Sequence, residues 1–566
     1  MPPDRPEPDA RREPLLIPAA PVAGGEWLLL AIVILAAIGF RGWQADALAV
    51  AHFDEGVYAS NLAASHLDYT YPERHLYAPP LWPRLLQEWQ TIFGRGPLPT
   101  MIPGLLAGVL SVAAVWWAAR AWYGPAGGLV AGTLLALSDT HVLFSRTALT
   151  DVPMTLLMLC GVFAGWRAML TTATGWTLAA GVLAGLAWSV KYNGWLTLAV
   201  SGAAAAGWVL FERRTPAVRK RHPLRRWLMI AGVATVTWLP TWWLLRGVGG
   251  YASVSQNHAQ YFVGPAGWWE SAMTQVRLSR EAAASGTWWP LVGLVGFGAV
   301  AVRPLGQSVA YFLAAILGTR SPLLTWLVPV VGTAARSLRN MRASVPTPQP
   351  RRLATWMTLA WMGGLFVATP LYTPYLRLTV PLVMAGCLMW ADLASRGERS
   401  DFTRRRHVAV GAGLLLLTIA VKGASLSAGG AAGFYERGDV AAAAVAIEAA
   451  VADAAAESGR QGSGIYVLGE PAVFFHLSSL EVEPTRPFIA QPAGNLGVLD
   501  RSATDARLEP FVVIGPHSRA QFPGVEDDPR LRLVGRFPAT PDLVTRLDAK
   551  ATGGHAEGGF AVYAVR

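Results

Sequence analysis

The chain of 566 residues is 53% hydrophobic and only 15% charged, which excludes an ordinary soluble protein of this length. Apolar runs recur along it, and a run of about 20 residues is enough to span a bilayer as a helix. The formal net charge of +11 does not indicate nucleic acid, because arginines gather in blocks between apolar runs, as in cytoplasmic loops. Composition therefore predicts a polytopic α-helical membrane protein that does not bind nucleic acid.

The basic residues before the first apolar run set the expected sidedness. Residues 1–24 are rich in proline and arginine and predict a disordered cytoplasmic tail. The first span, at about residues 27–49, then crosses outward, so the residues that follow it should be extracytoplasmic. We interpret this run as a retained helix, because no signal-peptide cleavage site follows it.

Seven spans are expected in the first half of the chain. They cover about residues 27–49, 99–122, 126–144, 152–170, 176–190, 195–211 and 227–245. The outer loop at 51–97 contains an amphipathic segment at 81–93, which predicts an interfacial helix. A second outer loop is expected at 246–287.

The second half of the membrane domain, which we assign to residues 25–430, is less regular. An eighth span at 288–302 and later spans at 353–369, 375–393 and 407–426 are expected. Residues 304–352 predict either a further hairpin or two interfacial helices, and both choices keep the number of crossings odd. We therefore expect about 11 to 13 transmembrane helices in the plasma (inner) membrane, with the C-terminus outside.

The composition changes near residue 431. A helix of small residues is expected at 439–456, and strands are expected at 464–469, 511–515, 531–534 and 560–565. Strands mixed with helices are typical of an α/β domain. Residues 431–566 are thus predicted to form a small extracytoplasmic α/β domain that caps or supports the outer loops.

Asp54 and Glu55 lie side by side directly after the first span. Such a pair can simply mark the membrane interface. It gains a functional interpretation because Asp151, Lys191 and Arg377 are expected on the same outer face, where a carboxylate could act as a general base. Whether a divalent cation binds Asp54 and Glu55 stays open at this stage.

The other charged candidates have structural alternatives. Lys191 lies between two apolar spans, where a lysine can snorkel or bind a phosphate. Asp151 can cap the helix that it begins, or pair with Arg146 to brace the outer loop. Arg377, at the outer end of a late span, can bind an anionic lipid head group or bulk phospholipid.

Four loop residues are weaker candidates, namely His52, His75, Tyr77 and His258. They are typical of polar loop side chains, some of which could touch a substrate. A cluster of His52 and His75 with the carboxylate pair matches no established metal-site spacing.

In this order the motifs resemble the C-type glycosyltransferases, specifically the family of protein O-mannosyltransferases and lipid A aminoarabinose transferases. The resemblance covers about residues 27–430 and rests on five segments. They are residues 53–58 (Phe-Asp-Glu-Gly-Val-Tyr), 78–82 with 92–94 (Ala-Pro-Pro-Leu-Trp and Ile-Phe-Gly), 146–151 (Arg to Asp), 185–191 (ending in Lys) and 375–381 (ending in Pro).

The resemblance implies a GT-C-like membrane fold and an enzyme that moves a sugar, with inversion, from a polyprenyl-phosphate donor to a lipid, glycan or protein acceptor outside the membrane. The implied base is Asp54, and Glu55 would help it by orienting either the acceptor or Asp54 itself. The implied phosphate ligands are Lys191 and Arg377, with Arg84 in reserve. The residues that would shape the site or bind the acceptor are Arg146, Asp151, His75, Tyr77 and His258. A transporter or lipid flippase for an envelope glycolipid is the alternative, because intramembrane charges also suit transport.

Overall fold

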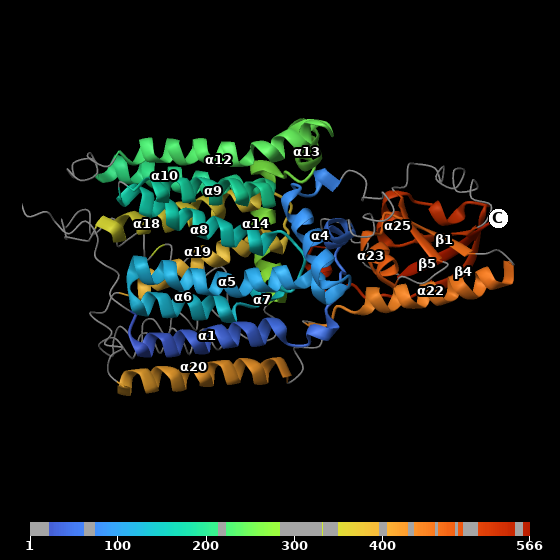
Figure 1. Cartoon of the computed structure of the whole chain (residues 1–566), viewed down its shortest axis with the longest axis horizontal. Coiled ribbons are helices and arrows are strands. Elements are labelled where there is room, and N and C mark those ends of the chain that lie inside the picture. Colours follow the sequence, from blue (N-terminus) through green and yellow to red (C-terminus); the bar gives the residue numbers. More distant parts are fainter. Residues whose placement is uncertain are drawn as a thin grey trace, which may run out of the picture.

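The structure is a computed structural model that describes residues 22–60, 74–171, 173–212, 222–282, 331, 349–395, 405–427, 435–458, 462–480, 485–490, 508–548 and 559–566. Long helices form a bundle, and a β-sheet lies beyond one end of that bundle (Figure 1). Most of the predicted tail, the eighth span and nearly all of the ambiguous region at 304–352 lie outside the described residues.

Long apolar helices account for the bundle. Their bounds are α1 (Gly24–Gly42), α5 (Pro97–Tyr123), α6 (Pro125–Leu137), α8 (Asp151–Leu170), α9 (Thr174–Val190), α10 (Leu196–Glu212), α12 (Pro223–Arg246), α18 (Gln349–Ala368), α19 (Val380–Ala394) and α20 (Arg405–Ser425). Within the described residues, six helices are long and apolar enough to cross a membrane, or up to seven if a bent pair counts as one span. The chain is a multi-pass membrane protein, and helices are present at each predicted span within the described ranges.

Two of these spans differ from their predicted form. The first helix ends at Gly42, and Gln44 then adopts a left-handed conformation with φ 49°, so the span is shorter than predicted. The third predicted span is broken at Ser138 into α6 and α7 (Asp139–Ser145), which meet at 62°. The Ser138 side chain caps α7 by accepting a hydrogen bond from the His141 N–H at 3.4 Å.

Four further helices lie at the end of the bundle that faces the sheet (Figure 1). They are α2 (Phe53–Ala59), α4 (Leu81–Phe93), α13 (Gly250–Ala259) and α14 (Gly264–Ala282). The amphipathic helix predicted at 81–93 is confirmed, since α4 buries Trp82 and Leu86 and exposes Ile92. The second predicted outer loop contains the two helices α13 and α14.

The described C-terminal residues form a five-stranded sheet. The strands are β1 (Gly462–Leu468), β2 (Thr485–Ala490), β3 (Leu508–Ile514), β4 (Leu531–Phe537) and β5 (Phe560–Val565), in the order β2-β1-β3-β5-β4. β1 pairs in parallel with β2 and β3, whereas β5 pairs antiparallel with β3 and β4. The helices of this part are α22 (Asp439–Ser458), α23 (Pro471–Leu480), α25 (Pro516–Gln521) and α26 (Leu543–Asp548).

Helices α2 and α23 join the bundle to the α/β part, and α23 lies on the side of the sheet that faces α4 (Figure 1). At Gly56 the two backbones touch, because a Cβ there would lie 2.3 Å from the backbone nitrogen of Ala472. Val57 on α2 and Val473 on α23 belong to one continuous apolar cluster. The sheet part is therefore packed firmly against the helix that carries Asp54 and Glu55.

Candidate functional site

The sequence around Asp54 folds into a capped helix start. Glu55 accepts the N–H groups of Ala51 and His52 at 3.2 and 3.0 Å, and His52 Nδ1 accepts the Asp54 N–H at 3.1 Å. These bonds satisfy donors that the first turn of α2 would otherwise leave unpaired. They fix the backbone of Asp54 and leave its carboxylate to face other elements.

Arg377 lies between two carboxylates. Its Nη1 donates to Asp54 Oδ2, and its Nε lies 3.2 Å from Asp548 Oδ2. His52 Nε2 lies 3.2 Å from the same Asp548 oxygen. Three segments far apart in the chain thus meet here, namely α2, the 3₁₀ helix η6 (Leu376–Thr379) just before α19, and α26.

A second ion pair stands beside the first. Lys191, which follows α9, donates to Asp151, the first residue of α8. Lys191 is close enough to Asp54 for its charge to help lower the Asp54 pKa, and Asp151 is close enough to Arg377 to stabilise the guanidinium charge. Asp54, Asp151, Lys191 and Arg377, which we call the charge cluster, are therefore brought together from four segments.

The two titratable groups on α2 are shifted in opposite directions. Burial alone would raise the pKa of the Asp54 carboxyl, but Arg377 and then His52 outweigh it and hold that pKa below its ordinary value. Burial would lower the pKa of His52, but the contact with the Asp548 carboxylate leaves that pKa raised. Asp54 is consequently ionised at neutral pH.

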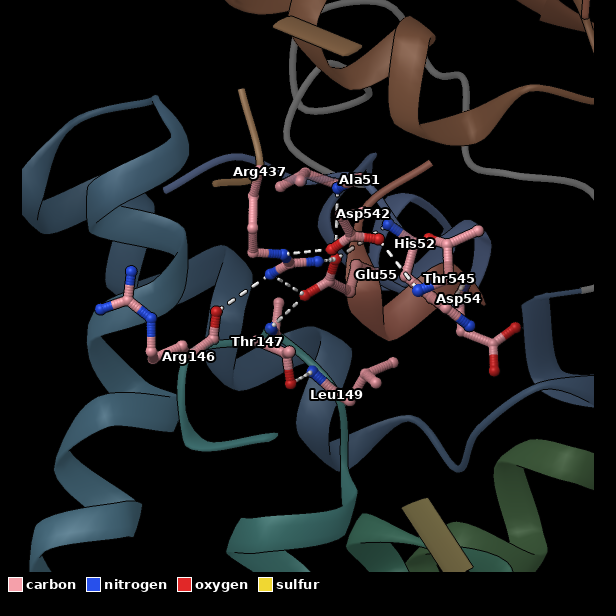
Figure 2. Close-up of polar contacts among 12 residues, drawn as sticks. Ala51, His52, Asp54, Glu55, Arg146, Thr147, Leu149, Arg437, Asp542 and Thr545 are labelled. Carbon is pink, nitrogen blue, oxygen red and sulfur yellow. Dashed lines mark hydrogen bonds and ion pairs between the residues drawn. The ribbon is translucent and has the colours of Figure 1, made fainter. Parts of the chain in front are cut away.

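Glu55 belongs to a different network (Figure 2). Its carboxylate points toward Arg437 and Asp542, whereas the Asp54 carboxylate points away from them. Arg437 Nη1 donates to Glu55 Oε1 at 3.0 Å, its Nη2 donates to Oε2, and its Nε donates to Asp542. Glu55 is 0% exposed and also accepts the Ala148 N–H at 2.9 Å. These contacts occupy both Glu55 oxygens and make Glu55 an anchor of α2, which fits a helper that orients Asp54 and not one that orients the acceptor.

Two arginines also differ from expectation. Arg146 does not pair with Asp151: it donates to the carbonyl oxygens of Arg41 and Trp43 at 2.6 Å, and its guanidinium lies 4.6 Å from the centre of the Tyr435 ring. Arg84 has a side chain that is 67% exposed and pairs with Glu88 one helical turn away. Arg84 is thus a surface residue of α4, which does not fit its predicted reserve role.

The loop candidates surround the charge cluster in different ways. The carbonyl oxygen of His75 accepts from the Tyr192 hydroxyl, and the Tyr77 ring lies 5.6 Å from that of Phe53. The His258 ring lies 5.6 Å from the Tyr192 ring. Burial lowers the pKa of His258, and the charges of Lys191, Asp54 and Arg377 all act on it, which places His258 near the cluster.

The carboxylate pair does not suit a shared metal ion in this arrangement. Both Glu55 oxygens accept from Arg437 and from backbone N–H groups, and they face away from Asp54. A metal held by Asp54 and Glu55 together would have to displace a buried arginine. Among the described residues no group of three or more His, Cys, Asp or Glu has metal-binding geometry.

Sequence reasoning missed the contribution of the C-terminal part, namely Arg437, Asp542 and Asp548. They lie outside the segments that carry the family resemblance, and α26, which carries the buried Asp548, is not among the elements that the sequence predicts. An acidic residue at that position needs cations from elsewhere, and Arg377 and His52 supply them.

The chain is similar to known proteins both over part of its sequence and in its fold. Residues 77–243 match the family model described as dolichyl-phosphate-mannose-protein mannosyltransferase. No curated protein sequence matches the chain. The fold is similar to ArnT from Cupriavidus metallidurans bound to undecaprenyl phosphate, with a TM-score of 0.55 and 16% identity, covering 96% of this chain and 98% of that one.

A second similar structure is the oligosaccharyltransferase of Archaeoglobus fulgidus in complex with Zn and sulfate. The TM-score is 0.50 and the identity 13%, covering 86% of this chain and 68% of that one. At such identities the likeness establishes the fold. The family model and the fold together confirm the resemblance to the C-type membrane glycosyltransferases that the sequence motifs predicted.

Proposed function

We propose that this protein transfers a sugar from a polyprenyl-phosphate donor to an acceptor hydroxyl at the extracytoplasmic face of the membrane. The charge cluster is the observation that carries the proposal, because it sets one carboxylate base beside two cations. Displacement of a phosphate from an anomeric carbon requires these two elements. The similar ArnT structure holds undecaprenyl phosphate, which supports a lipid phosphate as the leaving group.

In this reaction Asp54 takes the proton of the acceptor hydroxyl while the hydroxyl oxygen attacks the anomeric carbon. The bond between that carbon and the phosphate oxygen breaks, and its electron pair stays with the departing polyprenyl phosphate. Attack from the opposite face inverts the configuration. Lys191 and Arg377 stabilise the charge that develops on the phosphate.

Arg377 couples donor binding to the strength of the base. In the donor-free protein it pairs with Asp54, and this contact makes the carboxylate a weaker base. A donor phosphate competes for the same guanidinium. Because each shift of Arg377 toward the phosphate relieves Asp54, donor binding activates the base.

The proposed orientation puts the charge cluster and residues 431–566 outside, the N-terminus in the cytoplasm and about 11 to 13 spans in the plasma (inner) membrane. Helix α8 supports this orientation, because Asp151 begins it at the cluster and Arg167 lies in its last turn. Basic residues also start α12 and α18.

The direct test is Asp54→Asn in purified protein supplied with a polyprenyl-phosphate sugar and an acceptor. Loss of the base should reduce transfer by about 10²–10⁴-fold while the protein stays folded. Asp46→Asn, an exposed residue before α2, is the matched control and should transfer normally. Near-normal turnover in folded Asp54→Asn would remove the central claim. Mass spectrometry of envelope glycans from a deletion strain would identify the sugar and the acceptor.

A further inference from the structure

Asp548 brings a third carboxylate to the charge cluster from the C-terminal α/β part. It is 1% exposed, and its Oδ2 lies 3.2 Å from both Arg377 Nε and His52 Nε2. The proposed reaction assigns no step to it. A buried charge at the proposed phosphate site needs its own explanation.

The local contacts of Asp548 are poor for a structural ion pair. Its Oδ2 faces both cationic side chains, but no described residue donates a hydrogen bond to its buried Oδ1. A buried carboxylate with an unsatisfied oxygen costs stability relative to a neutral residue of the same size. Stability alone therefore does not favour an aspartate here.

The Arg377 guanidinium faces both Asp54 and Asp548. His52 Nδ1 accepts the Asp54 N–H, which leaves Nε2 as the ring nitrogen that faces Asp548. Lys191 is already paired with Asp151. One guanidinium is thus shared by two carboxylates, Asp54 and Asp548.

We propose that the Asp548 carboxylate neutralises the charge of Arg377 in the donor-free protein and gives up this contact when the donor phosphate binds. We call this the place-holding role of Asp548, and it rests on the proposed function. A guanidinium can bind a phosphate through two parallel N–H groups, and such bonds are stronger than the contact that Asp548 makes. A phosphate beside Arg377 is at the same time repelled by Asp548. This repulsion limits the affinity for the donor and also helps to expel the anionic polyprenyl phosphate after transfer.

The test measures the binding of undecaprenyl phosphate to the full-length protein in a neutral detergent. Removal of one like charge in Asp548→Asn should tighten binding about tenfold, equivalent to about 1.4 kcal/mol. Asp548→Ser provides a second neutral variant if Asp548→Asn folds poorly. Asp528→Asn, which removes a carboxylate paired with Arg530 in the same part of the chain, should bind like the unaltered protein.

Two further probes identify the source of the phosphate. Tighter binding of undecaprenyl phosphate and of inorganic phosphate in Asp548→Asn, without tighter binding of phosphatidylglycerol, supports exchange with the donor phosphate. An equal gain for phosphatidylglycerol overturns it in favour of a bulk-lipid site. Unchanged or weaker undecaprenyl phosphate binding in both neutral variants also overturns the proposal.

Arg377→Gln separates this inference from the proposed function. If Arg377→Gln leaves the affinity for undecaprenyl phosphate unchanged, the donor site itself is wrongly placed. If Arg377→Gln weakens binding but Asp548→Asn does not tighten it, the donor site stands and only the place-holding role of Asp548 fails.

Discussion

At the scale of single residues, Lys191 connects an ion pair to the proposed donor site. Its ammonium pairs with Asp151 and also acts on Asp54, so it lies where a phosphate would find a second cation. We expect Lys191→Ala to weaken undecaprenyl phosphate binding by at least about tenfold, measured in the same detergent assay.

The control for Lys191 must separate binding from folding. Lys191→Ala leaves Asp151 buried without its partner, which destabilises the protein. The double variant Lys191→Ala, Asp151→Asn should recover thermal stability but keep the weak binding. Normal donor affinity in a folded Lys191 variant would instead identify Lys191 as a snorkelling residue.

The pH dependence of transfer follows from Asp54. The base works only when ionised, so kcat/KM falls as the pH drops through the lowered Asp54 pKa, below the ordinary value of about 3.9. Arg377→Gln removes the strongest cause of the lowering and leaves burial, which raises the pKa. The acid limb of the pH–rate profile should then move to higher pH. Arg84→Gln, at an exposed pair, should leave the limb in place.

The residues of the charge cluster could be predicted because the order of the spans determines which side of the membrane each span end faces. Asp54, Lys191 and Arg377 each stand at the end of an apolar run, and the basic blocks assign those ends to one face. The direction of Glu55 could not be predicted, since it depends on the capping of α2 and on Arg437. Asp548 lies outside the segments that carry the family resemblance.

At the scale of elements, the contact of α2 with α23 controls where Asp54 stands. We expect Gly56→Ala to destabilise the protein by about 1–3 kcal/mol and to reduce transfer, because its Cβ would overlap the backbone of Ala472 at 2.3 Å. Thermal unfolding in detergent and a transfer assay measure the two effects.

The matched control is Gly39→Ala on α1, where an added Cβ meets nothing within 4 Å. Alanine favours a helix over glycine, so this variant should be as stable as the unaltered protein or slightly more stable. A Gly56→Ala protein with normal stability and normal transfer would show that α2 can shift without consequence for the site.

Helix positions followed from the sequence more closely than bends and edge strands did. Apolar periodicity predicts the position of α8. It does not predict the break between α6 and α7 at Ser138, because that break depends on a single side-chain cap. Strand β2 was not predicted, and it contains Pro487. A proline is tolerated in a strand at a sheet edge, which is where β2 lies.

At the scale of the whole molecule, the C-terminal part is joined to the proposed active site by charge as well as by packing. Arg437 pairs with Glu55 on α2 and with Asp542 just before α26, and it donates to the carbonyl oxygen of Arg146 at 2.9 Å. Asp548 ends that same α26 and faces Arg377. One short helix therefore links the anchor of α2 to the cation at the proposed phosphate site.

Arg437→Met should accordingly be among the most damaging single changes. It leaves Glu55 and Asp542 buried without their cation, and breaking a buried pair in this way costs about 3–5 kcal/mol. Thermal unfolding in detergent should show the loss, and transfer should fall with it because α2 loses its anchor. Arg530→Met, which breaks a more exposed pair with Asp528, should cost about 1 kcal/mol or less.

A triple variant distinguishes charge from shape in this network. Arg437→Met combined with Glu55→Gln and Asp542→Asn removes all three charges, so most of the stability lost in Arg437→Met should return. Transfer should recover in parallel if the network only holds α2 in place. A triple variant that is stable but inactive would show that the charge of Glu55 acts on the reaction itself, through the amide groups that it holds at the start of α2.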